Sequence, residues 1–226
     1  MNFRWNVVLE NWPVFVEGAK MTLFLSLLGI LFGTLIGMLV GLTRSQRYTN
    51  VGFRVVRSLL TAYVELMRGT PFLVQLYLVY YGAPLLFGID IPEFPAGIAA
   101  ISLNSGAYVS EIFRAGIQSI DKGQTEAGRS LGLTWWQTMR HIVLPQAVKR
   151  SLPPLGNEFI TLIKESSIVS VIGIQELAFK GRIVSSSTYA PFESLFLVAI
   201  VYLVMTWITG RLVGSLERRL KSGDQH

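Results

Sequence analysis

Residues 21–42 read MTLFLSLLGILFGTLIGMLVGL, and none of these 22 residues is Asp, Glu, Lys or Arg. About 20 apolar residues are enough for an α-helix to cross the hydrocarbon core of a bilayer. In that medium every backbone N–H and C=O needs a partner, which only a helix or a closed barrel provides. The apolar residues run continuously instead of alternating, unlike a barrel strand. The stretch therefore predicts an all-α membrane protein.

The composition of the whole chain agrees with this class. Of its 226 residues, 51% are hydrophobic and 15% are charged, whereas a soluble domain carries about 25% charged residues. There is no cysteine, and the two histidines, His141 and His226, are far apart in sequence, so no metal site is predicted. The net charge of +6 is better explained by basic loops beside membrane spans than by nucleic-acid binding.

Four glycines recur at every fourth position of the first span. Gly29, Gly33, Gly37 and Gly41 lie on one face of the predicted helix. Small residues on one face allow a neighbouring helix to approach closely. We interpret these glycines as a packing feature.

The second apolar segment, residues 55–87, is too long for one straight crossing. The sequence ELMRGTP at 65–71 interrupts it: Gly69 weakens the helix, Thr70 can cap, and Pro71 suits a first turn. A broken span is predicted. Three more spans are expected at about 95–117, 152–174 and 192–213, which makes about five in a single domain, 1–226.

Basic residues predict how the spans are oriented. Four arginines lie between residues 44 and 57, five Lys or Arg between 122 and 150, and three between 218 and 221, while the loop after the second span has none. Cytoplasmic loops are enriched in Lys and Arg, so we expect the N-terminus outside and the C-terminus in the cytoplasm. Lys180 and Arg182 oppose this pattern but are outnumbered. Residues 1–20, with Trp5 and Trp12, are predicted to lie in the membrane interface.

The predicted cytoplasmic loop, 118–151, contains an ordered pattern, EAGRSLGLTWWQTMRHIVLP at 126–145. A short helix is expected to end at Gly132, and Thr134 with Gln137 forms a capping-box pattern that starts a second helix. That helix is expected to run to about Val143 and to end at Pro145. Its tryptophans and arginines suit a protein contact surface or, equally, an interfacial helix with Trp at the lipid headgroups.

This loop resembles the cytoplasmic signature of ABC importer permeases: Glu-Ala-Ala, three residues, Gly, nine residues, Ile, one residue, Leu-Pro. Here Gly128 replaces the second alanine, a mild departure. The resemblance implies that the loop docks into a cleft of a cytoplasmic ATPase and couples its closure to the spans. The matching positions are Glu126, Ala127, Gly132, Ile142, Leu144 and Pro145. The expected ATPase-coupling residues are Glu126, Ala127, Gly132, Trp135, Arg140 and Pro145.

Further stretches resemble the polar amino acid branch of these permeases: YVELMRGTPFLVQL (63–76), LNSGAYVSEIFRAGI (103–117) and LGNEFITLIKESSIVSVIG (155–173). The resemblance implies the type I importer fold in a bacterial inner membrane. It also implies a second permease chain, identical or different, and an external or periplasmic binding protein. The chain itself is expected to be no enzyme and to hold no cofactor, because ATP and Mg²⁺ bind the separate ATPase subunits.

Polar residues inside the predicted spans are candidates for the transport path, since charge at bilayer depth usually faces a cavity. We expect Asn104, Tyr108, Asn157, Glu158 and Thr161 to contact an amino acid substrate near the midplane, with Glu158 favouring a basic one. The alternative is that the polar residues only pair with one another. Glu65 and Arg68, three residues apart, are predicted to form a structural ion pair, as are Glu111 and Arg114.

Other functions were weighed against an importer permease. A proton-coupled secondary transporter, with a relay through Glu158, Lys164 and Glu165, is the main alternative. The chain has no P-loop sequence, which agrees with a permease that has a separate ATPase and also with a proton-coupled transporter. The Gly132-centred loop favours the ABC permease, because a secondary transporter has no use for it. The sequence contains no catalytic motif of an intramembrane phosphatase or protease. A purely structural scaffold would leave the intramembrane carboxylates unexplained.

Overall fold

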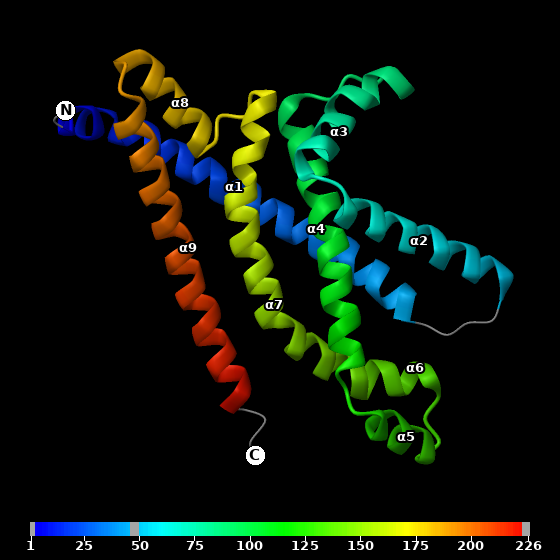
Figure 1. Cartoon of the computed structure of the whole chain (residues 1–226). Coiled ribbons are helices and arrows are strands. Elements are labelled where there is room, and N and C mark those ends of the chain that lie inside the picture. The colour runs from blue at the N-terminus through cyan, green and yellow to red at the C-terminus, as the bar shows by residue number, and fades with distance from the viewer. Residues whose placement is uncertain (1–2, 46–49, 223–226) are drawn as a thin grey trace.

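A computed structural model describes residues 3–45 and 50–222 (Figure 1), and every regular element in those ranges is helical. Arg47 and His226 lie outside the described residues. The two described ends of the chain lie at opposite ends of the molecule in this view. The elements are α1 Trp5–Ser45, α2 Val51–Gly69, α3 Phe72–Phe87, α4 Glu93–Gln118, α5 Lys122–Ser130, α6 Trp135–Thr138, a π-helical turn Met139–Val143, α7 Leu144–Glu165, a 3₁₀ helix Ser166–Ile172, α8 Leu177–Thr188 and α9 Pro191–Ser222.

The centre of the fold is the packing of α1 against α4. The predicted glycine face of α1 lies on α4, as expected. A Cβ atom at Gly33 would lie 2.8 Å from the Ser105 side chain, and one at Gly37 would lie 2.6 Å from Val109. These contacts leave no room for a side chain on that face. The glycines therefore set the distance between the two helices.

The predicted break in the second apolar segment is present. Helices α2 and α3 meet at a bend of 114°. Thr70 closes α2, with its hydroxyl donating to Leu66 O, and Pro71 is the N-cap of α3. Gln75 holds the bend, since its amide donates to Met67 O at 2.7 Å and to Thr70 O at 3.0 Å.

The expectation that Pro145 ends a helix is wrong. Helix α6, the π-turn and α7 follow one another without a break, and Pro145 lies in the first turn of α7. A proline in a helix lacks an N–H and crowds the carbonyl four residues earlier, here that of His141. The π-turn Met139–Val143 widens the helix at that residue, so the chain accommodates Pro145 and continues to Glu165.

Within residues 3–45 and 50–222, two helices, α1 and α9, are each long and apolar enough to cross a membrane, and α2 with α3 qualifies as one bent pair. Helices α4 and α7 carry several charged or polar residues, which lower their hydropathy. The count of five spans and their orientation therefore stay predictions. Residues 5–20, predicted to lie in the interface, form the first part of α1 and are continuous with the first span.

Candidate functional site: a charged cavity and an exposed helix–glycine–helix loop

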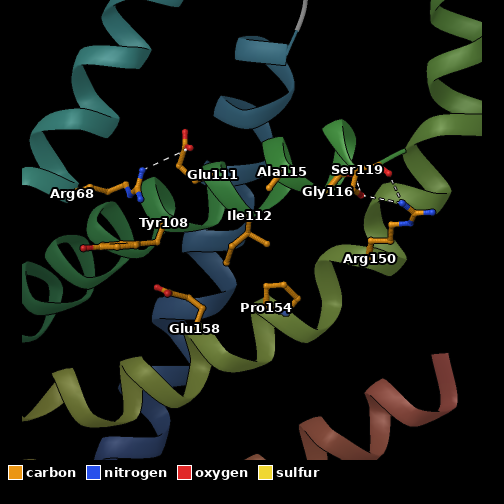
Figure 2. Close-up of a pocket in the computed structure, with 10 residues that line it drawn as sticks. All are labelled: Arg68, Tyr108, Glu111, Ile112, Ala115, Gly116, Ser119, Arg150, Pro154 and Glu158. Carbon is orange, nitrogen blue, oxygen red and sulfur yellow. Dashed lines mark hydrogen bonds and ion pairs between the residues drawn. The ribbon is translucent and has the colours of Figure 1, made fainter. Parts of the chain in front are cut away.

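A cavity of about 450 Å³ lies between α4 and α7, near the end of α2 (Figure 2). Helix α2 contributes Arg68, which the bend at Gly69 places at the end of its helix. Polar and charged side chains from three helices reach the cavity, and Ile112, Ala115 and Pro154 line the rest of its wall. The polar lining is Arg68, Tyr108, Glu111, Ser119, Arg150 and Glu158.

Arg68 enters the cavity instead of pairing with Glu65. Its guanidinium lies 3.7 Å from Glu111 and 5.6 Å from the centre of the Tyr108 ring. The ion pairs of the described chain do not include Glu65. The prediction of a Glu65–Arg68 pair is therefore wrong. Arg68 contacts side chains of another helix, α4. The spacing of Glu65 and Arg68 on α2 does not predict contacts with another helix.

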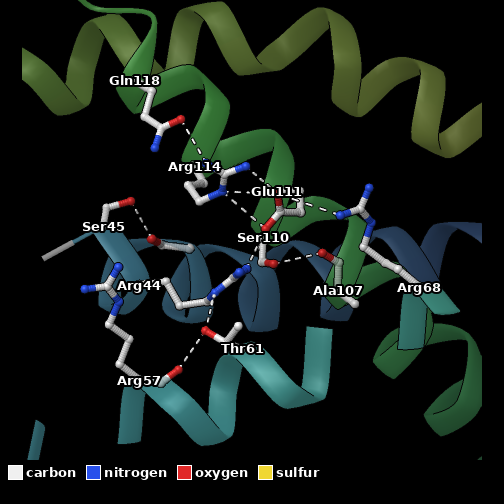
Figure 3. A network of polar contacts seen from close by, with 11 residues as sticks. Arg44, Ser45, Arg57, Thr61, Arg68, Ala107, Ser110, Glu111, Arg114 and Gln118 are labelled. Atoms are coloured by element: carbon white, nitrogen blue, oxygen red, sulfur yellow. Dashed lines mark hydrogen bonds and ion pairs between the residues drawn. The ribbon is translucent and has the colours of Figure 1, made fainter. Parts of the chain in front are cut away.

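Glu111 is the centre of a cluster of three arginines (Figure 3). Its carboxylate lies 2.5 Å from Arg44 of α1 and 2.6 Å from Arg114 of α4, besides the longer contact with Arg68 of α2. The predicted structural pair with Arg114 is confirmed. Since one carboxylate faces three guanidinium groups, the cluster has a net charge of +2 and joins α1, α2 and α4.

Glu158 extends from α7 towards the same cavity, on the side opposite Arg68 in Figure 2. None of the ion pairs in the described chain involves Glu158. The cavity thus presents a cationic group and an anionic group that are not paired with each other. Such a site can hold a ligand that carries both charges.

The five residues predicted to contact substrate do not all meet at this cavity. Tyr108 and Glu158 line it. Asn104 is buried and donates to Gln75 Oε1 at 2.8 Å, so it supports the α2–α3 bend. Asn157 lines a different cavity, between α7 and α9. The hydroxyl of Thr161 donates to the carbonyl of Asn157 at 3.2 Å.

The loop predicted to couple to an ATPase projects from one end of the molecule, where Figure 1 shows α5 and α6 side by side. Gly132 joins them with a φ of 80°, a left-handed conformation that favours glycine. The predicted capping box between Thr134 and Gln137 is present. The outer surface of the loop carries most of the predicted coupling residues: Glu126, Ala127, Gly132, Arg140 and Pro145 are exposed, and Trp135 is half-buried.

Gly128, which departs from the alanine of the signature, has a packing role. It is buried between α5 and α6, where an added Cβ would lie 2.8 Å from the methyl group of Thr138. Trp135 packs edge-on against Trp136, and 57% of the Trp136 surface is exposed. The loop is thus a compact pair of helices with Trp136 and Leu131, which is 80% exposed, on its surface.

One buried carboxylate was missed in the sequence. Glu176 is fully buried and caps α8, accepting from the backbone N–H groups of Ala178 and Phe179 at 3.0 and 2.8 Å. It also accepts from Tyr202 Oη at 2.6 Å and Thr22 Oγ1 at 3.3 Å. Glutamate is not one of the residues that usually cap a helix N-terminus, which are Ser, Thr, Asp and Asn, so no sequence signal marks this role. The contacts join α1, α8 and α9, so the role of Glu176 is structural.

The basic residues that opposed the orientation rule also have local partners. Lys180 lies 3.3 Å from Glu17, and Arg182 donates to Ser170 O at 3.1 Å. Within residues 3–45 and 50–222, no group of three or more His, Cys, Asp or Glu side chains is arranged to hold a metal ion.

The cavity between α4 and α7 and the exposed helix pair α5 and α6 agree with a family of transport proteins. Residues 29–222 match the family described as binding-protein-dependent transport system inner membrane components. The chain belongs to this family. Its members work with a binding protein, and the ATPase of such a system is a separate subunit, so this chain is a transport subunit of the inner membrane and not an enzyme.

Relatives agree over almost the whole chain. The glutamine transport system permease protein GlnP of Escherichia coli (strain K12) is 39% identical over 222 residues, covering 98% of this chain and 99% of the relative. The arginine transport system permease protein ArtQ of Bacillus subtilis (strain 168) is 38% identical over 224 residues, covering 99% and 100%. The resemblance to permeases of polar amino acid ABC importers is thereby confirmed, and nothing supports the proton-coupled alternative.

Solved structures show the same fold. A crystal structure of an amino acid ABC transporter with histidines has a chain 43% identical to this one, with a TM-score of 0.89 over 97% of this chain and 100% of the other. An inward-facing structure of the MetNI methionine ABC transporter has a chain that is 22% identical, with a TM-score of 0.70. The match covers 91% of this chain and 97% of the other. The predicted type I importer permease fold is confirmed.

Proposed function

We propose that this chain forms the membrane path for a polar or basic amino acid in an ATP-driven importer. Relatives named for glutamine and arginine, and a similar structure solved with histidines, support this class of substrate. The observation that carries the proposal is the cavity of about 450 Å³ with Arg68 and Glu158 on its wall. Cavities of this size suit small ligands.

The two charged side chains fit the two ends of a zwitterion. Among the described residues, the Arg68 guanidinium contacts Glu111 at 3.7 Å and the Tyr108 ring, so it retains donors for a substrate carboxylate. Glu158 supplies an acceptor for the substrate ammonium group or for a basic side chain. This arrangement accommodates neutral polar amino acids as well as basic ones.

A second permease chain, identical or different, closes the cavity in this proposal. Charged groups at bilayer depth rarely face lipid, and within the described chain the cavity is lined only by α2, α4 with the adjoining Ser119, and α7. An external binding protein delivers the substrate. ATP and Mg²⁺ bind the partner ATPases, whose closure moves the exposed loop of α5 and α6 and exposes the cavity to the outside.

The substrate site is tested with the chain reconstituted with its ATPase and binding protein. We expect Arg68→Gln and Glu158→Gln each to raise the substrate concentration for half-maximal ATPase stimulation by about 10-fold or more, the loss of one charged hydrogen bond. Glu65→Gln is a matched control, because Glu65 lies outside the cavity. If both cavity variants assemble normally and need the same substrate concentration for half-maximal stimulation as the wild type, the proposed site is wrong.

The coupling loop is tested in the same system. Glu126→Lys changes an exposed charge on the docking surface, and Gly132→Pro is incompatible with the left-handed φ of 80°. Both variants are expected to abolish substrate-stimulated ATPase activity while the protein remains folded. Retained stimulation in both would show that the ATPase binds elsewhere.

A further inference from the structure

A second cavity, of about 420 Å³, lies between the ends of α7 and α9 on the side of the molecule that carries α5 and α6, and the proposed transport function does not use it. Arg150 lines both cavities, so it lies between them. Helix α7 contributes one stripe of residues at spacings of three and four: Lys149, Arg150, Pro153, Pro154 and Asn157. Helix α9 contributes Glu217 and Leu220.

Helices α7 and α9 are in close contact at Gly156, next to the cavity-lining Asn157. An added Cβ at Gly156 would lie 2.5 Å from the Val213 side chain, so the helices touch there. The cavity extends from that contact towards the ends of both helices. Pro153, Pro154 and Leu220 form its apolar lining. Lys149 and Arg150, which also line it, are exposed.

The charged residues that line the cavity are Lys149, Arg150 and Glu217, so its net charge is positive. Helix α9 also carries Arg211, Arg218 and Arg219 near this end. Lys149 takes part in none of the ion pairs of the described chain. Arg211 stacks on the exposed Trp207 at 5.0 Å, an arrangement suited to the membrane interface, where tryptophan is enriched.

The two prolines add hydrogen-bond acceptors beside these cations. Proline has no N–H, so Pro153 and Pro154 cannot donate to the carbonyls of Lys149 and Arg150, four residues earlier in the helix. Both carbonyls therefore lack their usual helical N–H partner. The site thus combines two cations, the amide of Asn157 and apolar side chains.

We propose that this cavity binds an anionic phospholipid of the cytoplasmic leaflet, with its phosphate against Lys149 and Arg150 and an acyl chain against the prolines. Basic pockets between transmembrane helices on the cytoplasmic side suit such headgroups. Phosphatidylglycerol, whose phosphate carries one negative charge, is such a lipid. Glu217 on the α9 wall directs the phosphate towards α7. A lipid bound there stabilises the α7–α9 contact next to the coupling loop.

The experiment uses the full chain, purified with its ATPase, in nanodiscs. A phosphatidylglycerol with a photoreactive acyl chain is cross-linked, and the labelled residues are mapped by mass spectrometry. Labels are expected at 144–157 and 213–220. Exchanging both cations in Lys149→Gln/Arg150→Gln is expected to weaken labelling about 30-fold, and Lys149→Gln alone about 5-fold. The single variant leaves the hydrogen bonds of Arg150 to Ser119 in place.

Matched variants and competitors separate the outcomes. Arg54→Gln/Arg57→Gln removes two cations from a different surface, on α2, and is expected to leave labelling at α7 and α9 unchanged. Equal labelling by phosphatidylcholine, or unchanged labelling in both Lys149 variants, would overturn the proposal. Competition by inorganic phosphate alone would show instead a site for soluble anions. None of these outcomes depends on which substrate is transported, so failure here is distinct from failure of the proposed function.

Discussion

Glu111 balances more positive charge than any other carboxylate in the described ion pairs. It contacts Arg44, Arg68 and Arg114, and only 18% of its side chain is exposed. Glu111→Gln leaves three guanidinium groups with no counter-charge. We expect it to lower the free energy of unfolding by about 2 kcal/mol, less than for a fully buried pair because solvent screens part of the interaction.

The measurement for Glu111 is thermal unfolding of the purified protein at low and high salt. High salt should reduce the difference between the variant and the wild type, because ions screen the repulsion. Arg114→Gln is the control, since it leaves the carboxylate with Arg44 and Arg68, and its effect should be smaller. An equal or larger effect of Arg114→Gln would contradict the central role of Glu111.

Glu176 differs from Glu111 because hydrogen-bond donors, not cations, surround it. Glu176→Gln places an NH₂ group against the donors of Tyr202 and the α8 backbone, and we expect it to cost about 2 kcal/mol of stability. Tyr202→Phe removes one donor and is expected to cost about 1 kcal/mol. Thermal unfolding of both single variants and of the double variant measures this. Strictly additive effects would show that the 2.6 Å contact between the two residues carries no energy.

At the scale of elements, the glycine face of α1 gives a steric prediction. Gly37→Ala introduces a Cβ 2.6 Å from Val109 and 2.8 Å from the carbonyl of Gly106. Overpacking of this kind costs about 1–3 kcal/mol. Gly82→Ala in α3 is the matched control, because no atom lies within 4 Å of the new Cβ. Thermal unfolding of the purified variants should separate the two, and equal melting temperatures would contradict the packing role of Gly37.

The coupling loop allows a compensating pair of substitutions. Gly128→Ala crowds Thr138, with a new Cβ 2.8 Å from its methyl group and 2.9 Å from its hydroxyl oxygen. That hydroxyl has no hydrogen-bond partner in the described chain, so Thr138→Ala removes both atoms at little polar cost. We expect Gly128→Ala to weaken ATPase coupling and stability by about 1–2 kcal/mol, and the double variant to restore both. No recovery in the double variant would show that Gly128 acts through its backbone.

How much the sequence predicts at this scale depends on whether a signal is local. The break at Gly69–Pro71, the glycine face of α1 and the capping box of Thr134 each depend on residues within one segment, and all are present in the structure. The prediction that Pro145 ends a helix was wrong because a π-turn accommodates the proline. No local sequence pattern predicts that turn. The composition of the cavity was only half predicted: Tyr108 and Glu158 face it, but Asn104 is bonded to Gln75. Which of two neighbouring helices a polar side chain contacts depends on helix rotation, which the sequence of one helix does not determine.

At the scale of the whole molecule, the bent pair α2–α3 sets the number of spans. Its length, composition and 114° bend suit a broken span that crosses the membrane or a re-entrant pair that returns to the same side. The basic residues around Arg54 and Arg57 predict that α2 begins in the cytoplasm. If the pair crosses, the loop with Asp90 faces outside, and the number of spans is five.

The chain has no cysteine, so a single introduced cysteine reports the side of one residue without any background. Asn50→Cys and Gln137→Cys are expected to react with an impermeant thiol reagent only after the cells are opened, and Asp90→Cys in intact spheroplasts. Asn50, Asp90 and Gln137 are exposed. A lack of reaction in intact cells therefore shows that the residue lies on the cytoplasmic side, and not that it is buried in the protein. Since Asp90 precedes α4 and Gln137 follows it, these two sites must lie on opposite sides if α4 crosses. Labelling of Asn50→Cys on the same side as Asp90→Cys would therefore show a re-entrant α2–α3 pair, an even number of spans and an N-terminus in the cytoplasm.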